Sequence, residues 1–408
     1  MTSPARRSPE GRGLAARGAL ARLLNVQGIP HAFTFSLLQG ILILAVSVPF
    51  TVIPLRALAL LGDAQQVSAF YLGVGVVSLA GALGTPLLIQ AIGRRRSLAA
   101  GALAVLVAAP MFLTDSVVAL FVATALYTLG FFASDIAMNV AIMERIPRQQ
   151  FIRFEALRMA CLGAGFTLGP WLGVVLAEGI GLWVPFAVMV LCATGSSGYA
   201  LAAGLVANRS GLGAGRANPL RFIPRFLAQP RLRLAYLLAV LRSMWWSVFF
   251  VYAPIYCVES GFTNEDAGMV VSLGAAAVML TPLWSRLGAP LGMRRFLALS
   301  YAATGCVALV MVAFADLPLA GVGLLLGACV CASWIDAVGS APFVRAVRPL
   351  ERPEMTSLYT TYRDVGRIVP QGAFAVVLLV LPLSAVFALA GVAMLTASWF
   401  SRYIPRRY

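Results

Sequence analysis

The sequence contains no lysine and a single histidine, His31, although its formal net charge is +16. Its cationic side chains are therefore 31 arginines. A phosphate-binding loop needs a lysine and a metalloprotease helix needs a pair of histidines, so neither ATP hydrolysis nor this zinc chemistry is indicated. The six cysteines lie in apolar surroundings without the spacing of a metal site. We therefore expect no metal, no cofactor and no enzymatic activity.

Charged residues are also scarce, at 11%, whereas apolar residues make up 60% of the 408 positions. A soluble domain carries about 25% charged residues, so this composition excludes a soluble protein. A membrane helix needs about 20 apolar residues, and the chain has enough of them for roughly a dozen. The nucleic-acid binding that a strongly basic soluble chain would indicate is not expected here.

Apolar runs of spanning length recur from residue 33 to residue 400 and lack the alternation of a barrel strand. We therefore predict an all-α integral membrane protein with twelve transmembrane helices. The predicted spans are 33–58, 67–92, 98–113, 117–143, 151–176, 182–206, 234–258, 267–289, 296–314, 317–344, 355–381 and 383–400.

Arginines mass in alternate loops and in both terminal tails, whereas the intervening loops carry Asp and Glu. By the positive-inside rule this pattern places both termini in the cytoplasm and requires an even number of spans. We expect a multi-pass protein of the plasma membrane, the inner membrane of a bacterium. Residues 1–30 are interpreted as a basic cytoplasmic tail. An interfacial amphipathic helix over residues 14–24 and a mitochondrial transit peptide are the alternatives.

A faint internal repeat relates the two parts of the chain. Residues offset by 200 or 199 positions (247 − 47 = 200; 292 − 93 = 199) match in Ser47 and Ser247, Phe50 and Phe250, Pro54 and Pro254, and Gly93 and Gly292. We predict two pseudo-symmetric six-helix halves, 31–206 and 234–401, joined by a cytoplasmic linker, 207–233, and followed by a cytoplasmic tail, 402–408. Parallel repeats of this kind place a binding site at their interface.

Two glycine-containing motifs lie in the first half. Gly93, Arg94 and Arg95 follow the second span, where glycine permits a tight turn. The fifth span carries Gly165, Gly169, Pro170 and Gly173. Glycines four residues apart let a second helix approach closely, and a proline inside a helix removes a backbone donor and bends it.

With these motifs the chain resembles the major facilitator superfamily of secondary transporters from about residue 33 to residue 400. It is closest in motif to the drug and metabolite antiporters of that family. The family's loop motif reads Gly-x-x-x-Asp-Arg-x-Gly-Arg-Arg, and here Pro86, Gln90 and Ala91 replace its first Gly, its Asp and its first Arg. An ion pair at the cytoplasmic gate must therefore use another carboxylate, for which Glu144 and Glu155 are the candidates.

Charged residues inside the spans are the strongest functional signal, because each costs about 2.5–3.5 kcal/mol on insertion scales without a partner or an aqueous cavity. Asp135 in span four and Asp336 in span ten lie at matching depths. Arg158 and Arg363 lie about two turns into the following spans, which run antiparallel. We predict the ion pairs Asp135–Arg158 and Asp336–Arg363 and a role for them in proton coupling. A permanent structural role, and local bonds within each helix such as Glu155 with Arg158, are the alternatives.

Arg242 in span seven has no obvious acid nearby in the sequence. In the family that the chain resembles, spans one, four, seven and ten line a central cavity, which implies that Arg242 faces it together with Asp135 and Asp336. Further candidates for the cavity wall are Asn139, Trp245, Trp246, Tyr252 and Tyr359. An aromatic wall with charges of both signs suits an amphipathic organic solute.

The leading prediction is a monomeric secondary transporter in the lipid bilayer that exports a small organic solute by alternating access, with protons as the coupling ion. The alternative is a proton-coupled uptake permease for an anionic metabolite, in which Arg158, Arg242 and Arg363 bind the anion. A channel or a non-transporting membrane scaffold is the third interpretation.

Overall fold

The computed structural model describes residues 31–147, 150–206, 223–347, 355 and 358–405. Within this part of the chain the regular structure is helical and contains no strand, as the composition predicts. The predicted basic tail at residues 1–30, most of the predicted linker and residues 406–408 lie outside the described residues.

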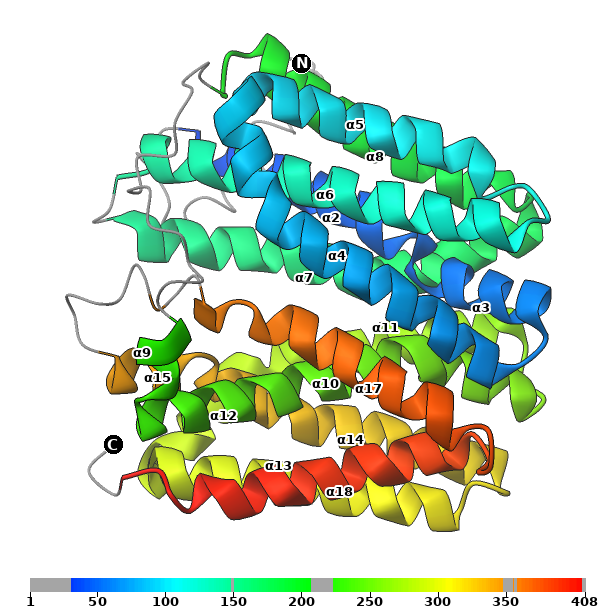
Figure 1. Ribbon diagram of the computed structural model, residues 1–408, viewed down its shortest axis with the longest axis vertical. Coiled ribbons are helices and arrows are strands. Elements are labelled where there is room, and N and C mark those ends of the chain that lie inside the picture. Colours follow the sequence, from blue (N-terminus) through cyan, green and yellow to red (C-terminus); the bar gives the residue numbers. More distant parts are fainter. Residues whose placement is uncertain (1–30, 148–149, 207–222, 348–354, 356–357, 406–408) are drawn as a thin grey trace, which may run out of the picture.

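The helices form two groups that lie side by side (Figure 1). The N-terminal group consists of α2 (Ala32–Ser47), α3 (Pro49–Leu61), α4 (Ala64–Ile92), α5 (Arg94–Met111), α6 (Val117–Arg145), α7 (Phe151–Gly179) and α8 (Trp183–Ala202). The C-terminal group consists of α9 (Ile223–Leu227), α10 (Pro230–Glu259), α11 (Asn264–Ala276), α12 (Thr281–Gly288), α13 (Gly292–Ala313), α14 (Pro318–Val338), α15 (Ala341–Ala346), α17 (Tyr362–Val377) and α18 (Ser384–Ser401).

We call the end of the bundle where α2 begins and α4 ends the linker end, and the opposite end, where α3 ends and α4 begins, the turn end. The linker end lies at the left of Figure 1 and the turn end at the right. Between the groups, α7 packs on α11, α4 on α17 and α3 on α10.

The apolar core shows where the two groups are joined. One large cluster of buried side chains combines residues of both groups, and its N-terminal-group members, such as Phe70, Leu120 and Val174, lie toward the turn end. At the linker end the buried side chains form separate clusters, one around Phe35 and Phe154 and one around Tyr359. Apolar burial therefore ties the groups together mainly toward the turn end.

Ten helices in the described part of the chain are long and apolar enough to cross a membrane. They coincide with ten of the twelve predicted spans. The other two predicted spans correspond to α5, whose 18 residues include three arginines at its start, and to α17, which has 16 described residues. Both pack within the bundle, α5 on α6 and α8, and α17 on α4 and α10.

The start of α10 and a break within the predicted span 267–289 are two of the differences from the sequence-based boundaries. Helix α10 begins at Pro230 rather than Leu234, because proline is well tolerated in the first turn of a helix, where a backbone N–H has no partner within the helix. The predicted span 267–289 is interrupted, since a 3-10 turn over Ala277–Leu280 separates α11 from α12. The corresponding span of the N-terminal group, α4, is continuous.

Residues matched by the repeat have corresponding places in the fold. Gly93 and Gly292 both adopt positive φ, 84° and 72°, at the linker-end junctions before α5 and within the start of α13. This conformation is costly for other residues because of their Cβ atom. Phe50 and Phe250 contact each other across the group boundary, with ring centroids 5.0 Å apart.

Candidate functional site

The polar side chains that gather at the site lie on six helices, α2, α6 and α7 in the N-terminal group and α10, α14 and α17 in the C-terminal group. Asp135 is eighteen residues from the start of α6 (135 − 117 = 18), and Asp336 is eighteen residues from the start of α14 (336 − 318 = 18). Both helices start at the turn end, so a common rise of about 1.5 Å per residue puts the two carboxylates at matching depth. Their side chains are half-buried.

In the N-terminal group, Arg158 forms its ion pair with Glu155 of the same helix, and its Nε lies 2.8 Å from Glu155 Oε2. Its Nη1 donates to Gln39 Oε1 at 2.9 Å and to Asn139 Oδ1 at 3.2 Å. Gln39 Nε2 donates in turn to Asp135 Oδ1 at 3.3 Å. We call these five side chains the N-terminal cluster.

The predicted Asp135–Arg158 ion pair is therefore wrong as a direct contact. Glu155 lies one helical turn from Arg158, and its two carboxylate oxygens accept from Nε and Nη2 along one edge of the guanidinium, as the local alternative predicts. Gln39 from α2 stands between Arg158 and Asp135, accepting from one and donating to the other. Sequence reasoning missed Gln39, although an amide in the otherwise apolar run of α2 is a signal for a buried polar partner.

In the C-terminal group, Asp336 is held by two side chains of α10. Its Oδ1 lies 3.2 Å from Arg242 Nη1, and its Oδ2 accepts a hydrogen bond of 2.8 Å from Trp246 Nε1. Arg242 Nη2 donates to the hydroxyl of Tyr362 at 3.1 Å. We call Arg242, Trp246, Asp336, Tyr362 and the adjacent Arg363 the C-terminal cluster.

The predicted Asp336–Arg363 ion pair is also wrong, because Asp336 pairs with Arg242. Arg242 and Trp246 are four residues apart and therefore lie on the same face of α10, where they close on both oxygens of the carboxylate. Arg363 Nε instead donates to the hydroxyl of Tyr362 at 3.2 Å. The Tyr362 ring also lies near both guanidinium carbons, at 5.4 Å from Arg242 and 5.8 Å from Arg363.

An aromatic cluster continues from Trp246 toward the other group. Trp246 stacks on Phe250, with centroids 5.7 Å apart. Phe250 contacts Phe50 at 5.0 Å and Phe166 at 6.5 Å, and both of these belong to the N-terminal group. Together the C-terminal cluster and these rings form one continuous run of polar and aromatic contacts.

The other side chains predicted for the cavity wall are buried in this conformation. Trp245 and Tyr252 are 1% and 0% exposed. Their side chains therefore pack against neighbouring helices and do not line an open cavity in this conformation. Tyr359 is also buried and stacks on Phe343, with centroids 4.0 Å apart. Asn139 lies in the N-terminal cluster.

Hydrogen bonds across the group boundary lie toward the turn end. The hydroxyls of Ser68 and Tyr252 are 2.7 Å apart across the boundary, and within its own group Tyr252 donates to Gln371 Oε1 at 2.5 Å. Asn264 Nδ2 donates to Glu178 Oε1 at 2.7 Å at the outermost turn. These contacts close the turn-end side of the group boundary, whereas both polar clusters lie on its linker-end side.

The glycine motif of α7 is a packing surface for α2 and α3. A Cβ atom on Gly169 would lie 2.0 Å from Ser47 Oγ, and one on Gly173 would lie 1.8 Å from the carbonyl oxygen of Val48. Ser47 donates its hydroxyl proton to the carbonyl of Gly165 at 2.8 Å. The close helix approach expected from this spacing is therefore present.

Just beyond Pro170, the same helix contacts the other group. The Trp171 backbone N–H donates to Ser272 Oγ of α11 at 2.9 Å. A Cβ atom on Gly268 would lie 3.0 Å from Val174 Cγ2 and 3.3 Å from the Pro170 carbonyl oxygen. The motif thus joins α7 to α2 and α3 on one side and to α11 on the other.

The loop motif places Arg94 in an ion pair with Glu144, with Nη1 2.7 Å from Oε2. Arg94 is 3% exposed, so this pair lies at the buried linker end of α5 and α6. Glu144 is thus the carboxylate that replaces the missing acid of the motif. Arg95 Nη2 reaches the carbonyl of Leu201 at 3.4 Å.

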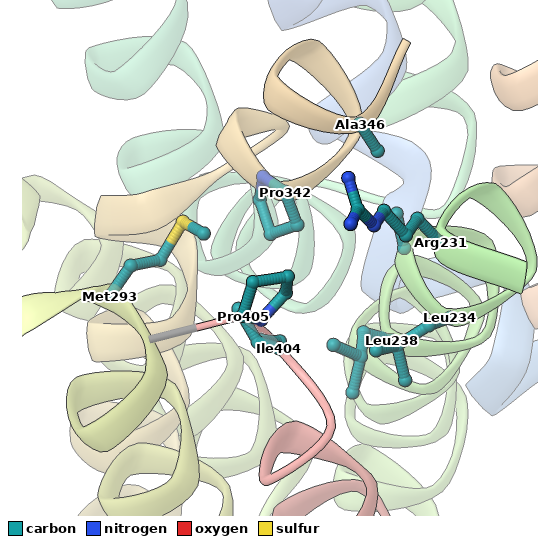
Figure 2. A pocket seen from close by; sticks show the side chains of 9 residues that line it. Arg231, Leu234, Leu238, Met293, Pro342, Ala346, Ile404 and Pro405 are labelled. Carbon is teal, nitrogen blue, oxygen red and sulfur yellow. The ribbon is translucent and has the colours of Figure 1, made fainter. Parts of the chain in front are cut away.

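The pocket drawn in Figure 2 is separate from both clusters. It lies at the linker end between α10, α13 and α15, where Pro342, Ile404 and Pro405 form part of its wall. Apart from Arg231 its lining side chains are apolar, so it offers little chemistry for selecting a polar solute.

Comparison with known proteins agrees with this architecture. The family model described as Major Facilitator Superfamily matches residues 35–370. The crystal structure of the nucleoside transporter NupG superposes with a TM-score of 0.70 at 14% identity, covering 92% of this chain and 99% of that chain. The peptide transporter POT in complex with alafosfalin gives 0.71 at 15% identity, covering 93% and 95%. At these identities the likeness shows a shared fold. No curated protein sequence matches the chain.

Proposed function

The chain belongs to the major facilitator superfamily, and from this premise we propose that it moves a small organic solute across the membrane by alternating access. It is a multi-pass membrane transporter and not an enzyme. We propose that α5 and α17 also span the bilayer, which gives twelve spans in two six-helix halves. These halves are 31–206 and 234–401, and they correspond to the N-terminal and C-terminal groups.

One observation carries this proposal: two half-buried polar clusters at matching depth lie on the linker-end side of a group boundary that is closed toward the turn end. A charged side chain at bilayer depth requires a partner or access to water. The two clusters lie on the linker-end side of the closed contacts, where each group has its own apolar core. They are therefore suited to bind a solute that arrives from the linker end. The arginine distribution supports a cytoplasmic location for the linker end and for both termini, in a plasma membrane or bacterial inner membrane.

We propose protons as the coupling ion and a monomer as the working unit. Asp135 supports the proton role, because it is held by the neutral amide of Gln39, whereas Glu155 and Asp336 are each paired with an arginine. A carboxylate without a direct cationic partner exchanges a proton more readily than one in an ion pair. The antiporter-like glycine motif favours export as the direction.

The Asp135→Asn variant is expected to uncouple solute movement from protons, because asparagine keeps the hydrogen bond from Gln39 but cannot take up a proton. Purified protein in liposomes with a luminal pH dye reports the proton flux that accompanies a transported solute. We expect this flux to be lost, whereas exchange of labelled for unlabelled solute continues.

Asp316→Asn is the matched control, because Asp316 is an exposed residue of the loop between α13 and α14. This substitution is expected to leave proton coupling unchanged. Normal proton flux in Asp135→Asn would remove Asp135 from the mechanism. Failure of the wild type to move any solute of a broad panel would instead favour a non-transporting scaffold.

Proton-coupled uptake of an anionic metabolite is the second candidate function, and it is favoured by Arg363, which forms no ion pair with a described carboxylate. Arg158 and Arg242 already have carboxylate partners. Comparing inside-out with right-side-out membrane vesicles separates the two directions, because an exporter loads the former and an uptake permease loads the latter.

A further inference from the structure

Two arginines of α17 stand apart from the ion pairs of the clusters. In the described part of the chain, Arg158 pairs with Glu155 and Arg242 with Asp336. Arg363 and Arg367 form no such pair with any described carboxylate. Their spacing of four residues places both side chains on the same face of the helix.

Both arginines lie near residues of the N-terminal group. Helix α17 lies beside α4 at the group boundary (Figure 1). Arg363 is exposed and interacts electrostatically with Asp135 of α6. Arg367 is half-buried and lies near the phenols of Tyr71 of α4 and Tyr127 of α6. Both arginines are thus carried by a helix that packs on the N-terminal group.

In the part of the chain that the structure describes, no direct ion pair neutralises either arginine. Arg363 and Arg367 repel each other. The nearest acid on the same helix, Asp364, is buried and interacts with both arginines without forming an ion pair with either. Two like charges in a medium of low dielectric constant raise the free energy of the site, and an anion between them lowers it. Guanidinium groups bind carboxylates and phosphonates through paired hydrogen bonds.

An apolar surface adjoins the arginines. Arg363 bonds to Tyr362, Tyr362 to Arg242, Arg242 to Asp336, and Asp336 to Trp246. Trp246 leads to the rings of Phe250, Phe50 and Phe166. A solute with an anionic head and an aromatic or aliphatic body therefore finds both complements along one continuous run of side chains.

We infer that Arg363 and Arg367 form the binding site for the oxyanion group of the transported solute, which is an organic carboxylate or phosphonate with an apolar body that packs against Trp246 and Phe250. The inference rests on the proposed transport function and names its substrate class. It also replaces Arg158 and Arg242 as the predicted anion ligands, because each of these guanidiniums already holds a carboxylate of the protein.

Binding of matched probes to the purified full-length protein tests this inference. The probes are phenylacetate, phenylphosphonate, the neutral phenylacetamide and inorganic sulfate. Their binding is measured by thermal shift and by titration calorimetry. We expect both organic anions to stabilise the wild type more than the amide or sulfate does. Arg363→Gln and Arg367→Gln should each weaken anion binding at least about tenfold, and the corresponding lysine variants should retain part of it because they keep the charge.

Arg402→Gln is the control, since Arg402 lies at the end of α18 with its guanidinium over the ring of Trp399. Variants are compared only where they elute as a single species in size-exclusion chromatography, and the lysine variants provide the comparison if a glutamine variant does not. Equal stabilisation by the amide and the acid overturns the inference, and so does anion binding that is unchanged in both glutamine variants.

The same variants separate this inference from the proposed function. If anions bind through Arg363 and Arg367 but liposomes exchange none of them, the anion site stands and the transport proposal fails. If the protein transports a neutral solute at a rate that Arg363→Gln and Arg367→Gln leave unchanged, the transport proposal stands and the anion site fails.

Discussion

Replacing Gly173 by alanine is expected to remove most of the folded protein. A Cβ atom at this position would lie 1.8 Å from the carbonyl oxygen of Val48 and 2.8 Å from its carbonyl carbon. Both atoms belong to the backbone at the junction of α2 and α3, so no side-chain rotation can relieve the contact. Overpacking of a close-packed interior costs typically 1–3 kcal/mol, and a clash with rigid backbone places this variant at or above about 3 kcal/mol.

Fluorescence-detected size-exclusion chromatography of membranes solubilised from equally expressing cells measures the loss, together with the midpoint of thermal unfolding. Gly195→Ala is the matched control, because Gly195 lies within α8 and a Cβ atom there would have no neighbour within 4 Å. Alanine should stabilise that helix slightly, by up to about 1 kcal/mol. A normal yield and midpoint for Gly173→Ala would mean that α7 does not pack against Val48.

The second large effect is expected at the Arg242–Asp336 pair. Arg242→Gln leaves the Asp336 carboxylate without its cation, although both side chains are mostly buried, at 13% and 18% exposure. Removing one partner of a buried ion pair costs about 3–5 kcal/mol, because the remaining charge is uncompensated. We therefore expect a lower midpoint of thermal unfolding and loss of transport.

The double variant Arg242→Gln with Asp336→Asn should recover most of the stability, since both charges are gone and Trp246 can still donate to the asparagine. This double-mutant cycle isolates the interaction from the effect of each substitution alone. A second double-mutant cycle with Asp336→Asn and Arg363→Gln provides the comparison. The structure predicts no coupling energy between Asp336 and Arg363, because the two side chains form no ion pair. A coupling energy for Asp336 with Arg363 that exceeds the one with Arg242 would restore the pairing expected from the sequence.

The repeat and the spacing of charges predicted which charged residues lie in the two polar clusters better than they predicted which of them form pairs. Asp135, Arg158, Arg242 and Asp336 all belong to the two clusters. Their partners were assigned by depth alone, and depth does not specify how each helix is rotated about its axis. Arg158, Arg242 and Arg363 all lie near the depth of Asp135 and Asp336 in the bundle. An assignment by depth alone therefore leaves several ion pairs possible.

Local sequence was more reliable where a contact depends on the backbone. The glycines at positions 165, 169 and 173 predicted a close helix approach without knowledge of the partner, because absence of a Cβ atom permits it wherever the second helix lies. Likewise, because the loop motif lacks its usual acid, the sequence predicted an ion pair with a carboxylate from elsewhere in the chain. Glu144 was one of two candidates, and the packing of α5 on α6 selected it.

The sequence by itself determined that this is a helical membrane protein, because the length and apolarity of its runs depend only on composition along the chain. The same runs, with glycine and proline at defined places, determined the family. Only the tertiary structure decided that Gln39 bridges Arg158 to Asp135, that Asp336 belongs to Arg242, and that Arg363 has no carboxylate partner among the described residues. Such contacts depend on the rotation and crossing of helices that are far apart in the chain, and a periodicity of 3.6 residues carries no information about them.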